Sequence, residues 1–298
     1  MKLNKLTLKD KRLFNKYLAL SKRELAAFSF ANIYIWKSLF DIRWAIIDSA
    51  LCVFFRDEIG CFMYLPPLAQ VRRPQAIKQV FTIMDCINKN KDISRIENIQ
   101  QQDLDYYRVL GYIMRNKYPD YLCLRSDLAA LRGNKFKSQR ASYNYFIKHQ
   151  NFNSRKLCAS DKTDCLSLFN LWLNERKAIS SDDIYRGMLE DSHKVIIEAL
   201  INYKQLGLEG IVVMVNQAIK GFTFGYKLNN DTFCVLYEIT DLALKGLAQF
   251  IFRKLCEELK IYRYINIMDD SGLENLRKVK LSYKPQRLIP AYIATRDV

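Results

Sequence analysis

The sequence predicts an α/β protein of the α+β type, with mixed sheets flanked by helices, in two domains of similar construction. Two observations predict it. The same order of elements occurs in each half of the chain: helices, then a three-stranded meander, then a helix followed by a strand. The chain has 298 residues, half of them apolar, which is enough for two domains that each bury a core.

The first half is expected to open on two helices, over residues 9–20 and 21–40. The second begins with Ser21 and Glu24 in a Ser-x-x-Glu capping arrangement. Apolar alternation between turn signals predicts the strands that follow. In order, the further elements are strands 42–48, 51–56 and 61–65, a helix 74–89, a strand 93–99 and a helix 101–110.

The second half repeats this order. Its elements are expected to be helices 160–177 and 182–206, strands 210–215, 218–228 and 232–239, a helix 246–259, a strand 262–267, a short helix 272–279 and a strand 288–294. The intervening residues 150–160 are polar and lack helical periodicity. We therefore expect an N-terminal domain over 1–155 and a C-terminal domain over 156–298 that carries the active site. A meander leading into a strand–helix–strand unit is the order expected of the acetyltransferase-like (GNAT) fold.

Charge and cysteine content limit the class of partner. Residues 1–150 carry 26 basic and 13 acidic side chains, whereas residues 151–298 carry 21 and 18. This surplus predicts a polyanionic partner: a tRNA, a nucleotide-containing cofactor or an anionic lipid surface. The eight cysteines show no C-x-x-C spacing and mostly lie in apolar runs, which predicts buried thiols in a reducing compartment. With only His149 and His193 besides, no metal site is predicted.

The apolar stretches indicate no transmembrane segment. The charge-free stretch 25–36 has twelve residues, short of the roughly 20 that a spanning helix needs. Residues 42–65 are interrupted by charged side chains, and no secretory signal is evident. We expect a cytoplasmic protein, with peripheral association at a membrane as the alternative.

Candidate catalytic residues cluster in the segment 266–283, NIMDDSGLENLRKVKLSY, directly after an apolar strand. Asp270 is expected to orient or deprotonate an attacking group, or to bind an α-ammonium. Arg277 offers the planar fork that suits phosphate, and Lys280 adds a point charge one turn away. A solvated amphipathic helix is the competing interpretation. Glu238, at the end of another strand, is a second catalytic carboxylate candidate, for which a solvated strand terminus is the alternative.

Two blocks of the sequence look like the phosphatidylglycerol lysyltransferase C-terminal family, the catalytic region of aminoacyl-phosphatidylglycerol synthases. The first is residues 120–123, 128–140, Asn144 and Phe146, and the second comprises Asn266, Asp270, Gly272, Leu276, Arg277, Lys280, Ser282, Tyr283 and Pro285. The resemblance covers the chain from about Phe28 to Ala294. Gln139, Arg140 and Ala141 stand where a Lys-Arg-Asn run is expected, which bears on the substrate more than on the fold.

The resemblance implies two GNAT-like domains in tandem and transfer of an aminoacyl group, from aminoacyl-tRNA, to an amine or hydroxyl acceptor such as an anionic phospholipid headgroup. No cofactor is then required. The alternative within enzymes is an N-acyltransferase that uses acyl-CoA, with coenzyme A as its cofactor. The alternative outside enzymes is a protein that binds tRNA or a membrane surface without catalysis. The large membrane-embedded portion of the synthases is not expected in this chain.

The donor is expected to be recognised by two stretches. Residues 132–156 carry seven basic side chains and no acidic one, with aromatic residues between them, which suits phosphate contact and base stacking. A basic surface helix with its aromatics in the core is the alternative. The turn 240–246 contains one glycine, Gly246, so an anion cradle for acyl-CoA is poorly supported there. The residues expected to bind substrate are Asn266, Ser282, Tyr283, Arg140, Asn144, Lys137, Lys135 and Gly246.

Overall fold

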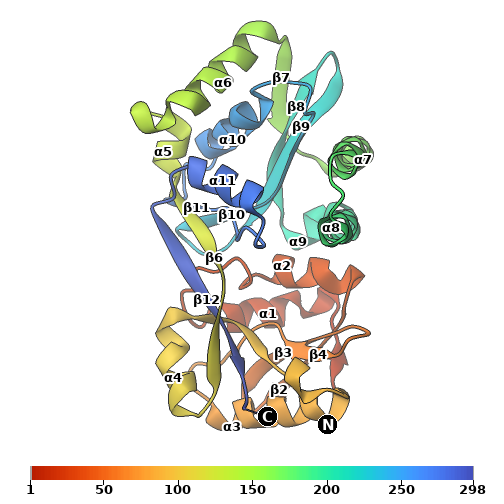
Figure 1. The fold of residues 1–298 in the computed structure, drawn as a ribbon, viewed down its shortest axis with the longest axis vertical. Helices are drawn as coiled ribbons and strands as arrows, with labels where there is room; N and C mark the ends of the chain where they lie inside the picture. The colour runs from red at the N-terminus through yellow and green to blue at the C-terminus, as the bar shows by residue number, and fades with distance from the viewer. Residues whose placement is uncertain (1, 298) are drawn as a thin grey trace. The chain divides into compact units, whose positions relative to one another are not determined.

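A computed structural model describes residues 2–297 (Figure 1). The chain forms two compact units, each described here by itself. Unit 1 contains the chain up to Asp120, together with Asp269–Gly272 and the chain from Leu288 onwards. Unit 2 contains Tyr121–Met268 and Leu273–Arg287. Each unit combines a mixed sheet with helices, as the element order of the sequence predicts.

Unit 1 is built on strands in the order β1-β2-β3-β4-β5-β12. Their bounds are β1 Asn4–Lys5, β2 Asp41–Ile47, β3 Ala50–Arg56, β4 Cys61–Met63, β5 Ile96–Gln100 and β12 Arg287–Thr295. The predicted meander is confirmed: β2, β3 and β4 pair antiparallel in sequence order. The parallel pairing of β4 with β5 is limited to Met63 and Ile96.

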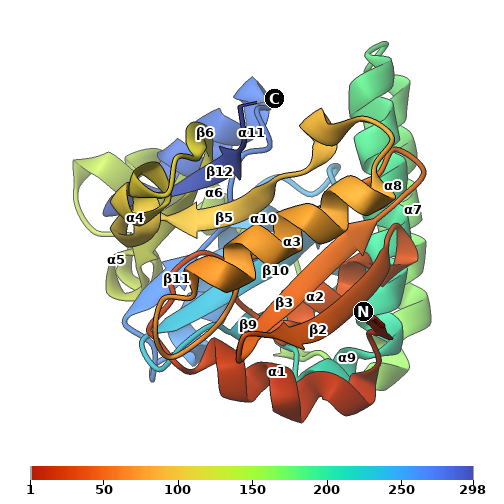
Figure 2. The same ribbon diagram turned by 90° about the horizontal axis from the view of Figure 1, so that it is seen from below.

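Helices cover both faces of the sheet of unit 1. They are α1 Lys11–Leu18, α2 Phe30–Ile35, α3 Pro74–Ile87 and α4 Leu104–Val109, with short 3-10 turns at Leu8–Asp10, Trp36–Ser38, Lys91–Ile93 and Gln101–Asp103. Helix α3 lies over the strands of this sheet (Figure 2). Its five buried side chains belong to the same core as Ala45, Phe54 and Met63. On the other face, Phe14 of α1 contacts both Trp44 of β2 and Phe30 of α2.

The predicted helix over 21–40 is wrong in its first half. Helix α2 begins only at Phe30, where the Ser29 side chain accepts a hydrogen bond from the N–H of Ala31. Residues 21–29 contain no helix, so Ser21 does not cap one. The physical reason is tertiary: residues 25–28 are buried, and the N–H of Ala26 donates to the Asp120 carboxylate at 2.6 Å instead of to a helical carbonyl.

Unit 2 is built on strands in the order β6-β11-β10-β9-β8-β7. Their bounds are β6 Ile113–Leu124, β7 Phe152–Lys156, β8 Glu209–Val215, β9 Ala218–Lys227, β10 Thr232–Thr240 and β11 Tyr264–Asn266. The second predicted meander, β8 to β10, is confirmed. Only the last part of β6 belongs to unit 2, where Leu122–Leu124 pairs antiparallel with β11.

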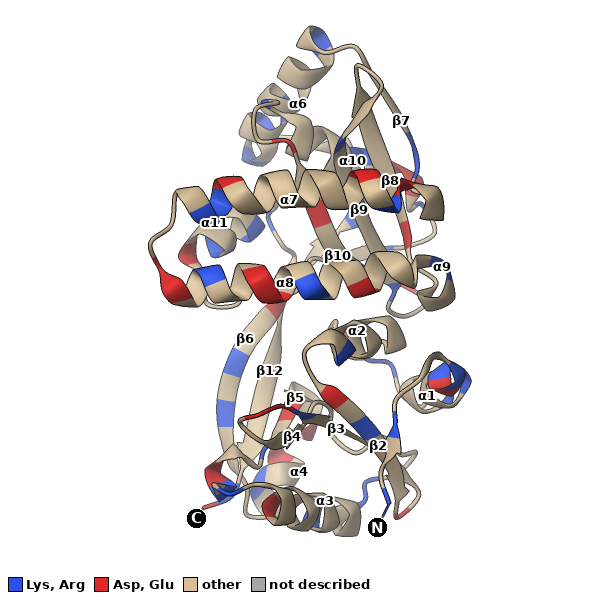
Figure 3. Ribbon diagram, turned by 90° about the vertical axis from the view of Figure 1, so that its right-hand side faces the viewer, with Lys and Arg blue, Asp and Glu red and all other residues tan. Residues whose placement is uncertain are grey.

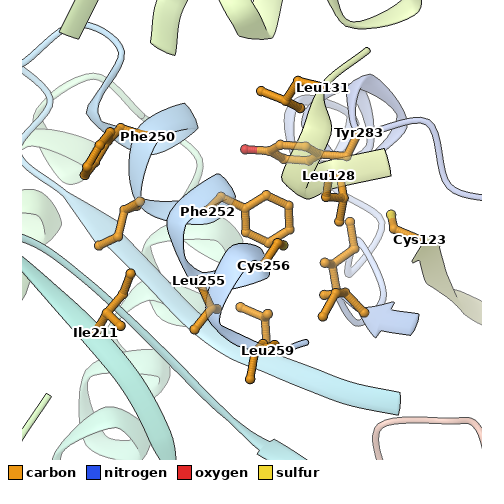
Figure 4. Close-up of a cluster of buried hydrophobic side chains, with 14 of the residues drawn as sticks. Cys123, Leu128, Leu131, Ile211, Phe250, Phe252, Leu255, Cys256, Leu259 and Tyr283 are labelled. Atoms are coloured by element: carbon orange, nitrogen blue, oxygen red, sulfur yellow. The ribbon is translucent and has the colours of Figure 1, made fainter. Parts of the chain in front are cut away.

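The helices of unit 2 lie on both sides of this sheet. They are α5 Arg125–Ala130, α6 Lys137–His149, α7 Lys162–Ala178, α8 Asp183–Ile201, α9 Tyr203–Leu206, α10 Leu247–Glu258 and α11 Glu274–Ser282, with 3-10 turns at Asn134–Phe136 and Ala159–Asp161. Helices α7 and α8 run side by side over one face (Figure 3). The other face packs on α10, whose side chains form the centre of the core of unit 2 (Figure 4).

The chain divides at Asp120 and Tyr121, earlier than the expected boundary at 155 and 156. The expected boundary lies inside β7, which pairs with β8 from Phe152 to Lys156 and so belongs to the sheet of unit 2. Strand β7 has a polar sequence and only partial burial because it forms the edge of the sheet. Polar edge strands lack the apolar alternation that a prediction needs, and the same applies to β6, whose first seven residues are exposed or half-buried.

Candidate active site

The sheet of unit 2 opens where β11 leaves β10. Parallel pairing between them covers only Thr232–Cys234 and Tyr264–Asn266. Strand β10 continues to Thr240 along β9, with a β-bulge between Val235 and Tyr237. The backbone of β10 after Cys234 therefore has a strand partner on one side only, and a bulge at such a place re-aims the side chains that follow it.

Glu238 lies on this part of β10 and is half-buried. Within residues 2–297, no hydrogen bond or ion pair to its carboxylate is formed, and burial raises the pKa of Glu238 to about 8. Tyr237 faces α7 and α8, since its ring meets Phe169 and its hydroxyl donates to the Ser192 carbonyl at 3.1 Å. Because neighbouring strand residues point to opposite faces, Glu238 faces α10.

The surroundings of Glu238 are apolar. Its charge raises the pKa values of Tyr283 and Cys256, for both of which burial is the larger cause. Cys256 lies on α10, and the ring of Tyr283 packs on Phe252 of the same helix at a centroid distance of 4.5 Å (Figure 4). The interpretation of Glu238 as a solvated strand terminus is therefore wrong. The local signal was present: Glu238 stands between Tyr237 and Ile239, inside an apolar strand.

Asp270 does not lie in the same unit as the other two catalytic candidates of its segment. It belongs to unit 1, whereas Arg277 and Lys280 lie on α11 of unit 2. Its side chain is buried, and one carboxylate oxygen accepts a hydrogen bond from the N–H of Gly272 at 3.0 Å. Asp269 likewise accepts from the N–H of Ser271 at 2.8 Å. Both carboxylates thus stabilise the turn at Asp269–Gly272.

Arg277 and Lys280 differ in what they contact. Arg277 is exposed, and its guanidinium forms no ion pair or hydrogen bond in the part of the chain that the structure describes. Lys280 is half-buried and donates from Nζ to the carbonyl oxygen of Ile267, just past the end of β11. The charge of Lys280 also opposes the burial that raises the pKa of Cys123 to about 12. Arg277 is therefore available to an anionic ligand, and Lys280 also holds the strand end.

The expected substrate contacts of this segment carry structural roles. Asn266 is fully buried, and its side-chain oxygen accepts from the N–H of Met268 at 2.7 Å. The Ser282 hydroxyl donates to the Val279 carbonyl at 2.6 Å at the end of α11. The Ser282 carbonyl accepts from Gln139 at 2.7 Å, which ties α11 to α6. Of the substrate contacts expected in this segment, only Tyr283 lies near Glu238, where β10 and β11 separate.

Gly246 is required by packing. It precedes α10 with a φ of 87°, and a Cβ added there would lie 2.0 Å from the carbonyl oxygen of Ser142 on α6. The side chain of Lys245 extends over the ring of Tyr145, also on α6, at 4.8 Å. The backbone of α6 therefore covers the beginning of α10, with an electronegative oxygen against it.

The basic stretch 132–156 separates into internal and exposed side chains. The Arg140 guanidinium donates to the carbonyl oxygens of Leu131 and Gly133, which closes the loop before α6. Arg155 pairs with Asp161 at 2.7 Å and Lys135 with Asp127 at 2.6 Å. The exposed basic residues of the stretch that pair with no acidic side chain in residues 2–297 are Arg132, Lys137, Lys148 and Lys156.

The aromatic residues of this stretch separate in the same way. Phe136 and Phe146 are fully buried in the core of unit 2, and Tyr143 stacks on Phe250 at 5.7 Å. Tyr145 is 41% exposed and stacks on His149 at 4.2 Å. Asn144 is exposed beside Tyr145. Some residues of the stretch thus fit a nucleic-acid contact, and others fit a basic surface helix with its aromatics in the core.

No group of three His, Cys, Asp or Glu side chains is placed to hold a metal ion within residues 2–297. All eight cysteines are free, and only Cys86 and Cys158 are exposed. Over the same range, no helix is long and apolar enough to cross a membrane.

The paired units, each with a meander leading into parallel strands, define a tandem protein of the GNAT-like acyltransferase class. The chain belongs to the phosphatidylglycerol lysyltransferase C-terminal family, which it matches over residues 18–295. This family is one of aminoacyl transferases. The expected resemblance and fold class are confirmed. No curated protein matches the sequence.

Solved structures support the same fold. A conserved protein of unknown function from Bacteroides thetaiotaomicron is 27% identical, with a TM-score of 0.89 and coverage of 100% of both chains. L-PGS from Bacillus licheniformis is 15% identical, with a TM-score of 0.66 and coverage of 96% of this chain and 92% of that one. A tandem GNAT protein from the clavulanic acid biosynthesis pathway is 9% identical, with a TM-score of 0.52 and coverage of 98% and 97%.

Proposed function

We propose that the protein transfers an aminoacyl group from aminoacyl-tRNA to a hydroxyl or amine acceptor, of which the headgroup of phosphatidylglycerol is the best candidate. Glu238 of unit 2 is proposed to move the proton in this reaction. The observation that carries the proposal is the half-buried Glu238 carboxyl, without a partner in residues 2–297, beside the opening of β10 and β11.

The chemistry needs one group that can take and return a proton. The acceptor hydroxyl attacks the ester carbonyl carbon of the aminoacyl group, and a new C–O bond forms. When the tetrahedral intermediate collapses, the bond from that carbon to the ribose oxygen breaks, and the proton ends on the ribose oxygen. A carboxyl with a pKa of about 8 exchanges protons readily near neutral pH. An ordinary exposed Glu, with a pKa near 4.3, is a much weaker base.

The beginning of α10 supports a donor other than acyl-CoA. In a GNAT-like unit the turn before this helix would have to hold a pyrophosphate on free backbone N–H groups. Here the Ser142 carbonyl oxygen lies against Gly246, where it would repel an anion. The neighbouring α6 instead presents exposed Lys137 and Lys148 and the exposed ring of Tyr145, which suit an RNA strand.

The acceptor is inferred from the family and from α11. The family description names phosphatidylglycerol, whose headgroup offers free hydroxyls beside a phosphate. Arg277 is an exposed guanidinium that no acidic side chain of residues 2–297 neutralises. The planar fork of a guanidinium binds phosphate in a bidentate manner. Arg277 is therefore proposed to bind the phosphate of the acceptor or of the donor.

The test is to incubate the purified protein with a pool of charged tRNAs and phosphatidylglycerol vesicles, and to detect aminoacylated lipid by mass spectrometry. Glu238→Gln should lower turnover by on the order of 10²- to 10⁴-fold. The rate of the wild type is expected to rise as pH approaches about 8, where Glu238 loses its proton, and the variant should lack this rise. Glu209→Gln, at the exposed start of β8, is the matched control and should retain activity.

Two results would contradict the proposal. If Glu238→Gln keeps the activity and pH profile of the wild type, the proton is moved by another group. If acetyl-CoA supports turnover while charged tRNA does not, the donor is acyl-CoA, and α6 must move away from α10 to admit it.

A further inference from the structure

The N-terminal segment of unit 1 is the most strongly charged part of the chain that the proposed reaction leaves unused. Its first 23 residues carry eight basic side chains and one acidic, Asp10. Asp10 is turned back on its own chain, where its carboxylate accepts from the N–H and the hydroxyl of Thr7 at 2.8 and 2.9 Å. It therefore does not neutralise the basic side chains of α1.

The basic residues form a row along α1. Arg12 and Lys16 are exposed on α1 at a spacing of four, which places them on one side of the helix, and Lys9 is exposed in the 3-10 turn that leads into it, three residues before Arg12. None of the three forms an ion pair within residues 2–297. The opposite side of α1 is fixed to unit 1, because Phe14 is fully buried against Trp44 and Phe30. The exposed side chains of the row thus lie on the side of α1 away from the buried Phe14; Figure 3 shows the basic positions of α1 in blue.

An apolar residue continues the row. Leu20 lies in the turn that follows α1, four residues after Lys16, and is 39% exposed. Cationic side chains next to an exposed leucine are typical of a helix that lies in the headgroup region of a bilayer. There the ammonium groups meet phosphates and the apolar side chain enters the acyl boundary. A surface that binds RNA would gain nothing from Leu20 and would carry exposed aromatic rings, as α6 does with Tyr145.

We propose that Lys9, Arg12, Lys16 and Leu20, here called the α1 row, dock the protein on an anionic phospholipid bilayer. The choice of a lipid surface over RNA rests in part on the proposed acceptor, a lipid that resides in such a bilayer. Since no helix within residues 2–297 can cross a membrane, docking by this part of the chain must occur at the surface. The α1 row supplies three positive charges and one apolar side chain for it.

The first experiment measures sedimentation with vesicles of mixed phosphatidylglycerol and phosphatidylcholine, and with vesicles of phosphatidylcholine alone. The variant Arg12→Glu/Lys16→Glu should lose binding to the anionic vesicles by at least about 25-fold, because each basic side chain near such a surface contributes about fivefold. The control Lys78→Glu/Lys91→Glu changes two exposed basic residues elsewhere in unit 1 and should bind as the wild type does. Both variants lower the net charge from +16 to +12.

The second experiment separates a membrane from other polyanions. Leu20→Gln leaves the charge unchanged and should weaken vesicle binding without altering the affinity for tRNA. Equal losses in the α1 variant and its control would show that only net charge matters. Unchanged vesicle binding of the α1 variant, or a loss confined to tRNA, would also overturn the proposal. Thermal unfolding of each variant shows whether it is folded.

A third measurement distinguishes failure of docking from failure of the proposed reaction. Arg12→Glu/Lys16→Glu should lose turnover on phosphatidylglycerol in vesicles but keep the wild-type rate on a dispersed short-chain phosphatidylglycerol. If the wild type modifies neither form, the proposed reaction is wrong, and the vesicle sedimentation still decides the role of the α1 row. Equal losses on both forms would place the α1 row in the reaction itself and contradict a docking role.

Discussion

The carbonyl oxygen of Ser142 occupies the space that a side chain at Gly246 would need. Gly246→Ala must push α6 away from α10, and an alanine is also strained at a φ of 87°. We expect a loss of on the order of 3 kcal/mol in the free energy of unfolding. Gly133→Ala is the control, since Gly133 has a φ of 80° but nothing within 4 Å of an added Cβ. It should cost about 1 kcal/mol. Equal effects in denaturant titrations would refute the packing role.

The raised pKa of Glu238 makes stability depend on pH. In the folded protein Glu238 keeps its proton up to about pH 8, whereas in the unfolded chain it releases the proton near the ordinary pKa of 4.5. Between these values the unfolded state binds fewer protons, so the free energy of unfolding falls as pH rises.

Glu238→Gln removes this dependence, because glutamine stays neutral. We expect the variant to match the wild type near pH 4 and to be more stable by on the order of 1–3 kcal/mol above pH 8. Urea titrations of both proteins across this range measure the difference. A constant difference at every pH would mean that Glu238 is well solvated and has an ordinary pKa.

Arg277 is predicted to act on the reaction and not on the fold. Because its guanidinium is exposed and has no partner within residues 2–297, Arg277→Ala should change the free energy of unfolding by only tenths of a kcal/mol. Turnover should fall by on the order of 10²- to 10³-fold if Arg277 stabilises charge in the transition state. Arg277→Lys should rescue poorly, since a point charge does not copy the bidentate fork. Lys278→Ala on the same helix is the control; if it costs as much, the effect is not specific to Arg277.

The basic stretch is expected to bind tRNA through its exposed side chains alone. Lys137→Glu/Lys148→Glu should weaken tRNA binding and reduce the slope of log affinity against log salt by roughly two contacts. Arg140→Glu should instead destabilise the protein, because it removes the donor to the Leu131 and Gly133 carbonyls. Binding titrations at several salt concentrations, with unfolding curves of the same samples, test both statements. An unchanged slope would leave α6 as an ordinary basic surface helix.

What could be predicted from the sequence depends on local patterns. Apolar residues at period-two or helical spacing identify strands and helices that bury one face. Such spacing predicted the strands of both meanders and the helices α3, α7 and α10, and the structure contains all of them. The element order and the two sequence blocks were enough for the tandem fold and the family. The polar edge strand β7, the polar first part of β6 and the buried segment 25–28 carry no such period, so β6, β7 and the start of α2 were missed.

The sequence by itself determined the class of protein, the order of the elements that bury one apolar face, the cationic surplus and the residues from which a site could be chosen. Only the tertiary structure decided what those residues do. Asp270 and Arg140 form hydrogen bonds with backbone groups. Gly246 leaves room for the backbone of α6, and Glu238 holds its carboxyl in apolar surroundings. The physical reason is that the pKa and hydrogen bonds of a side chain depend on burial, and the groups that bury it come from segments distant in the chain. For Glu238, the groups that bury the carboxyl are α10 and Tyr283. Both come later in the sequence, so the sequence of strand β10 alone could not predict them.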